Sequence, residues 1–144
     1  MVYFARRWYR PFRLFQLSRV GEFPHDSMAV SNPDQGVRGM SRRARIEALL
    51  LEEPGDVFLR YSLALEFEKE GHPEESLRRL TELTREQPAY VPAFFMAAQQ
   101  LARQQRGDEA RAFLRDGIEH ARGQGDHHAA GEMSELLASL GPMG

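Results

Sequence analysis

The feature that most constrains the fold of this chain is an internal repeat with a constant spacing. Six pairs of positions one repeat apart carry similar residues, namely Pro54 and Pro88, Leu63 and Ala97, Ala64 and Ala98, Phe67 and Leu101, Ser76 and Ala110, and Leu80 and Leu114. A period between about 20 and 50 residues, as here, is typical of proteins built from stacked supersecondary units, in which each unit buries its apolar face against the next. The repeat therefore predicts a stack of similar units.

Within each unit the apolar residues recur at helical spacing, and no segment has the alternation of a strand. We expect six helices, at residues 41–53, 57–70, 73–86, 92–105, 109–123 and 126–140. Four residues are suited to cap them at the N-terminus, namely Ser41, Asp56, Asp108 and Asp126. The residues expected on the buried faces include Ile46, Leu49, Leu50, Leu59, Leu63, Phe67, Leu77, Leu80, Leu83, Phe94, Ala97, Ala98, Leu101, Ala110, Phe113, Leu114, Ile118, Met133, Leu136, Leu137 and Leu140. The fold class predicted from this pattern is all-α, with antiparallel helices joined by short turns.

Residues 41–140 resemble the tetratricopeptide repeat (TPR) family, in its small bacterial form. Leu63-Ala64 resemble the Leu-Gly pair of the family's first helix, Gly71 its turn glycine and Pro88 its terminal proline, while Ser76 and Ala110 resemble the small residue of its second helix. The resemblance implies a short right-handed superhelical stack of antiparallel helix pairs. It implies two full units, at 57–90 and 91–124, with one flanking helix on each side.

Three positions depart from the pattern of that family. Arg60 stands at the place of an early tryptophan, and Gly117 at the place of an alanine in the second helix. Gln105 replaces the turn glycine of the second unit, and we expect Gly107, which follows shortly after it, to do similar work.

The sequence divides near residue 40 into an arm and a helical domain. Residues 1–39 form a basic and aromatic segment that becomes loop-like, with six arginines against three acids. Residues 40–141 form the repeat domain, 142–144 are a tail, and residues 40–144 carry a net charge of −5. The arm is expected to be disordered, to bind a membrane surface or partner, or to be absent from a native chain that starts at Met28 or Met40.

Composition excludes several kinds of chemistry. The chain has no cysteine, so it has neither disulfides nor thiolate metal sites, and it has no apolar stretch long enough for an integral membrane segment. The histidines near residue 125, which are His120, His127 and His128, are interpreted as surface residues and not as metal ligands. The acidic run of Glu66, Glu68, Glu70, Glu74 and Glu75 is interpreted as a solvated face. No nucleophile or phosphate-loop motif occurs, so we expect no enzyme and no cofactor.

The remaining helix faces give the functional hypothesis. The resemblance implies that the first helix of each pair lines a concave groove that binds peptides. On the two first helices, the residues on that side are Phe58, Tyr61, Leu65, Glu68, Lys69, Phe95, Gln99, Ala102 and Arg103. Tyr61, Leu65 and Phe95 would bury apolar groups of a partner, and Lys69 and Arg103 would orient its acidic groups. The alternative is that these residues are core, covered by the last helix or by the arm.

Two functions remain open at this point. The first is a non-catalytic, cytoplasmic module that binds an unidentified protein or peptide on the concave face. The second is a structural protein that associates with copies of itself, and therefore a homo-oligomer, with the arm at a membrane surface. Nucleic-acid binding is disfavoured by the negative charge of the repeat domain.

Overall fold

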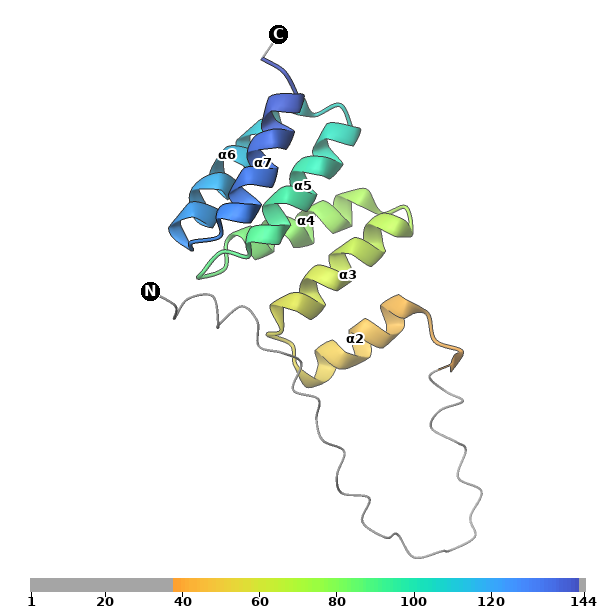
Figure 1. The fold of residues 1–144 in the computed structure, drawn as a ribbon. Coiled ribbons are helices and arrows are strands. Elements are labelled where there is room, and N and C mark those ends of the chain that lie inside the picture. Colours follow the sequence, from red (N-terminus) through yellow and green to blue (C-terminus); the bar gives the residue numbers. More distant parts are fainter. Residues whose placement is uncertain (1–37, 143–144) are drawn as a thin grey trace, which may run out of the picture. The chain divides into compact units, whose positions relative to one another are not determined.

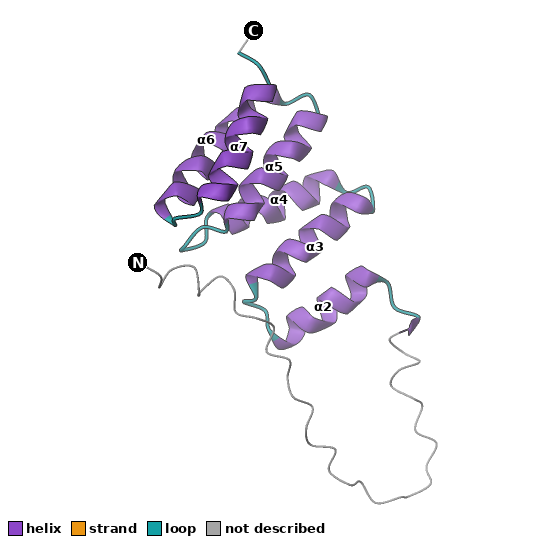
Figure 2. Ribbon diagram, in the orientation of Figure 1, coloured by secondary structure: helices purple, strands orange, loops and turns teal. Residues whose placement is uncertain are grey.

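A computed structural model describes residues 38–142, and this part of the chain contains helices and no strand (Figures 1 and 2). The prediction of an all-α fold is confirmed. The helices are α2 (Arg42–Glu52), α3 (Val57–Lys69), α4 (Pro73–Thr84), α5 (Val91–Arg103), α6 (Gly107–Gly123) and α7 (His127–Ser139). Each of them packs on the next along the chain, and α5 also contacts α7. All belong to one compact unit, Met40–Gly144.

Side-chain caps begin three of the helices as the sequence predicts. Ser41 accepts a hydrogen bond from the Ala44 amide (3.1 Å), Asp56 from the Leu59 amide (2.8 Å) and Asp126 from the Ala129 amide (3.0 Å). Each acceptor satisfies one of the amides that a helix start leaves unpaired.

The cap predicted at Asp108 is wrong. Helix α6 already begins at Gly107 and has no side-chain cap, so Asp108 lies inside its first turn. There the carboxylate accepts a hydrogen bond from the guanidinium of Arg111 (2.9 Å). An acid in the first turn is still favourable, because the N-terminus of a helix carries partial positive charge.

The turns after α3 and α5 use the same backbone geometry at equivalent positions. Gly71 has a φ of 83°, and Gln105, the equivalent residue one repeat later, has a φ of 62°. Gly107 therefore does not replace the missing turn glycine, because Gln105 itself adopts the left-handed conformation.

The core lies between α3 and α7 and contains most of the apolar residues expected there. The central helix α5 buries Phe94, Ala97, Ala98 and Leu101, as predicted. Leu49 was expected on a buried face but is exposed. It lies on α2, the first helix of the described part, which packs mainly on α3 and so has one covered side.

Buried polar contacts recur with the period of the repeat. Gln100 donates a hydrogen bond to Ser76 (2.7 Å), and both side chains are fully buried between α4 and α5. One period earlier, Arg42 forms an ion pair with Glu66 (3.3 Å), which is 7% exposed. The prediction of a fully solvated acidic run is thus wrong at Glu66, because this carboxylate is enclosed between α2 and α3.

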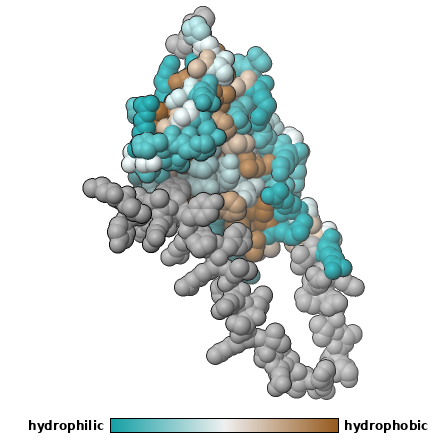
Figure 3. All heavy atoms as spheres, in the orientation of Figure 1, coloured by the Kyte–Doolittle hydropathy of each residue, from teal (hydrophilic) through white to brown (hydrophobic). Residues whose placement is uncertain are grey.

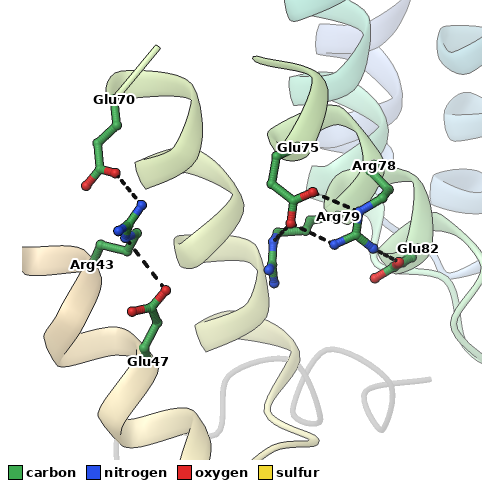
Figure 4. Close-up of polar contacts among 7 residues, drawn as sticks. All are labelled: Arg43, Glu47, Glu70, Glu75, Arg78, Arg79 and Glu82. Carbon is green, nitrogen blue, oxygen red and sulfur yellow. Dashed lines mark hydrogen bonds and ion pairs between the residues drawn. The ribbon is translucent and has the colours of Figure 1, made fainter. Parts of the chain in front are cut away.

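Several ion pairs lie on the surface of α2, α3 and α4 (Figure 4). Arg43 on α2 contacts Glu70 at the end of α3 (2.7 Å) and Glu47 on its own helix (3.6 Å). The guanidinium carbons of Arg43 and Arg79 lie 5.2 and 4.7 Å from the centre of the Phe67 ring. These cation–π contacts connect α2 and α4 to α3. Phe67 is only half-buried, and its ring contacts two guanidinium groups.

Candidate functional site

The candidate site is a pocket of about 240 Å³ on one side of α3, α5 and α7. It brings together residues of α3, α5 and α7, which alternate along the chain with α4 and α6. The lining residues are Tyr61, Val91, Pro92, Phe95, Asp126, His128, Ala129, Glu132 and Met133.

Two tyrosines form an aromatic contact beside this pocket. The rings of Tyr61 on α3 and Tyr90, the residue before α5, lie 5.3 Å apart between centres and are tilted by 59°. Burial raises the pKa of Tyr61, and burial together with the nearby Tyr61 and Asp56 raises the pKa of Tyr90 to about 12. Both hydroxyls are therefore protonated at neutral pH and can act as hydrogen-bond donors.

The exposed charged residues of the pocket lie at the start of α7, and we call them its mouth. Asp126 caps this helix, and His128 lies 3.5 Å from Glu132 across one helical turn. Among the described residues, no lysine or arginine lines the pocket. The acidic and basic side chains that line it, apart from the phenol of Tyr61, are therefore two carboxylates and one exposed imidazole.

The structure places two of the predicted groove residues, Tyr61 and Phe95, together in the pocket. Both are partly buried against the core. Leu65 and Gln99 are half-buried and do not line the pocket, and Phe58 is exposed near the start of α3.

The predicted cations are engaged within the protein. Arg103 on α5 donates a hydrogen bond to Glu68 on α3, and Lys69 forms an ion pair with Glu66 (3.1 Å). Neither cation lines the pocket. Their expected role, orienting acidic groups of a partner, therefore lies outside the pocket and in competition with Glu68 and Glu66.

Sequence reasoning missed the contribution of α7. Tyr61 and Phe95 are equivalent positions of successive repeats, and the same spacing applied once more leads to Ala129, which also lines the pocket. Extending the repeat by one period was therefore a signal that could have found this wall. Asp126 has the same signal, because it is the equivalent of Pro92, which also lines the pocket, whereas Glu132 has none, because its equivalent is the buried Ala98.

A second hollow of about 330 Å³ runs along the exposed face of α4 and involves Arg78 and Glu82. Glu75 accepts hydrogen bonds from Arg78 (2.7 and 2.9 Å) and from Arg79 (2.7 Å), as Figure 4 shows. These guanidinium groups lower the pKa of Glu75 to about 2. Because this carboxylate stays ionised and paired, the α4 face has the properties of a structural salt-bridge surface.

The histidines do not converge. His120 stacks on Phe94 with 5.2 Å between ring centres, while His128 pairs with Glu132. In residues 38–142, no three metal-ligating side chains come together. No helix of this part of the chain is long and apolar enough to cross a membrane.

Apolar residues on the face shown in Figure 3 form patches over α2 and α3 and again over α5 and α7.

Comparison with known proteins adds no relative. No family model matches the chain, and no curated protein or solved structure matches it either.

Proposed function

We propose that residues 40–141 form a non-catalytic protein-interaction module, a TPR-like stack that binds a peptide segment of a partner protein. In this proposal the module acts in the cytoplasm and without a cofactor. The observation that supports it best is the pocket between α3, α5 and α7. Two aromatic side chains at equivalent repeat positions, Tyr61 and Phe95, line this pocket and keep part of their surface accessible. Aromatic anchors in a concave site are the residues that most often dominate binding energy.

Affinity capture with matched variants tests the proposal. The intact chain is used as bait in lysate of the source organism, beside Tyr61→Ala/Phe95→Ala and a control variant, Arg78→Ala/Glu82→Ala, on the α4 surface. We expect a partner that the native and control baits retain and that the aromatic double variant loses at least tenfold. Circular dichroism checks that all three baits keep the same helix content. Equal capture by the three folded baits would contradict the assignment of the pocket.

A second candidate, self-association, is supported by a different observation. Among the described residues, the large apolar side chains with exposed surfaces are Met40, Leu49, Leu51 and Phe58. All four lie on or beside α2 and the start of α3, at one end of the helical unit. A second copy of the chain could cover this end. Sedimentation velocity over a range of concentrations separates this candidate from the first.

A further inference from the structure

The α3–α5–α7 pocket combines an apolar wall with an acidic mouth. Tyr61, Phe95 and Met133 supply the wall, and Asp126 and Glu132 supply carboxylates. At about 240 Å³ the pocket is smaller than the roughly 300–1,000 Å³ of usual small-molecule sites. It is therefore suited to one or two side chains of a peptide and not to a cofactor.

The two carboxylates differ from most acids of this domain because neither is paired with an arginine or lysine of the described residues. Glu66, Glu68, Glu70, Glu75, Glu82 and Glu86 each form an ion pair with an arginine or lysine. Asp126 instead accepts a hydrogen bond from the Ala129 amide, and the ion-pair partner of Glu132 is His128 at 3.5 Å. The side chain of Glu132 is 54% exposed, so a ligand can reach it.

The helix termini do not cancel this negative charge. The N-termini of α5 and α7 lie at the pocket, and each is equivalent to about half a positive charge. Two carboxylates against about one positive charge leave a net charge of about −1 at the mouth.

We propose that this pocket binds a basic side chain next to an apolar one, so that its occupant is a peptide segment with arginine or lysine beside leucine, phenylalanine or tryptophan. The apolar side chain contacts Tyr61 and Phe95, while the cation lies against Glu132 and Asp126. This inference rests on the proposed function. The sequence suggested a partner with acidic groups, whereas the pocket favours a partner with basic ones. The charge complementarity favours basic partners mainly through specificity and association rate.

Selection from a phage-displayed library of random heptapeptides tests the proposal, with the intact chain as the target. We expect the enriched peptides to carry arginine or lysine within two positions of a large apolar residue. Their binding should fall at least tenfold on Glu132→Lys and weaken as salt is added. It should change less than about twofold on Glu135→Lys, a matched change on the exposed surface of α7 outside the pocket.

The possible results separate this inference from the proposed function. Peptides that are acidic, or that bind Glu132→Lys as well as the native chain, overturn the inference. If such peptides still lose binding to Tyr61→Ala/Phe95→Ala, the interaction module stands. Peptides that bind regardless of both changes overturn the two proposals together, and a selection with no enrichment overturns the inference.

Discussion

Gln105 occupies a backbone conformation that suits glycine. Its φ of 62° places the residue in the left-handed region, where residues with a Cβ atom are strained by about 1–3 kcal/mol. The side chain is exposed, so little packing compensates for this strain. The equivalent residue of the preceding turn, Gly71, avoids the strain altogether.

We therefore expect Gln105→Gly to stabilise the domain. Relief of strain is partly offset by the greater freedom of glycine in the unfolded chain, which leaves a gain of about 0.5–1 kcal/mol in the free energy of unfolding. Thermal unfolding followed by circular dichroism measures the gain. The reciprocal change, Gly71→Gln, should lower stability by about 1 kcal/mol or more. A loss of stability in Gln105→Gly would show that the glutamine side chain holds the turn.

At the scale of the helices, α6 approaches its neighbours so closely that one position excludes a side chain. A Cβ atom at Gly117 would lie 2.6 Å from the Met133 sulfur on α7 and 2.6 Å from the Phe94 Cβ on α5. The Phe94 Cβ is fixed by the backbone, so relief requires the helices to move apart. The departure from the family pattern at this position has a physical reason, since glycine permits α6 to pack on both neighbours at once.

Gly117→Ala is accordingly expected to destabilise the domain by about 1–3 kcal/mol, the usual cost of overpacking a core. Gly131, within α7, is a matched control because a Cβ atom there meets no atom within 4 Å. Gly131→Ala should stabilise the domain by as much as about 1 kcal/mol, since alanine favours the helix. Urea unfolding of both variants measures the difference. If Gly117→Ala equals Gly131→Ala in stability, the close helix contact is not present in solution.

For the whole molecule, the sequence was sufficient to predict the helices, three of their caps and the core of the central helices, but not the start of α6 or the turn at Gln105. Caps such as Ser41 and turn residues such as Gly71 act through their immediate neighbours, so their effects are readable from sequence. The helix side left over from packing, together with the resemblance, also pointed to Tyr61 and Phe95, and both line the pocket. What the sequence could not identify is the place of Glu132 in the pocket, because this residue reaches it only through the packing of α7 on α6 and α5. The ion pairs between helices could not be predicted either, because Arg103 on α5 and Glu68 on α3 meet only when the two helices pack together.

The α2 end of the helical unit exposes large apolar side chains. Leu49, Leu51 and Phe58 are 49%, 86% and 55% exposed around the turn between α2 and α3. These exposed apolar side chains give this end of the unit apolar area that a second copy of the chain can cover. If this end pairs with a second copy, the sedimentation coefficient of the intact chain should rise between about 1 and 100 μM, a range that brackets typical weak dimers.

Leu51→Ser/Phe58→Ser should abolish that rise, because it removes the apolar area that drives association. Both positions are exposed, so the variant should keep the helix content and unfolding temperature of the native monomer to within a few degrees. Tyr61→Ala/Phe95→Ala is the matched control, since it alters the pocket and leaves the α2 end intact. A native chain that stays monomeric throughout would exclude self-association at this end. A rise that persists in the serine variant and disappears in the pocket variant would instead place the interface between copies at the pocket.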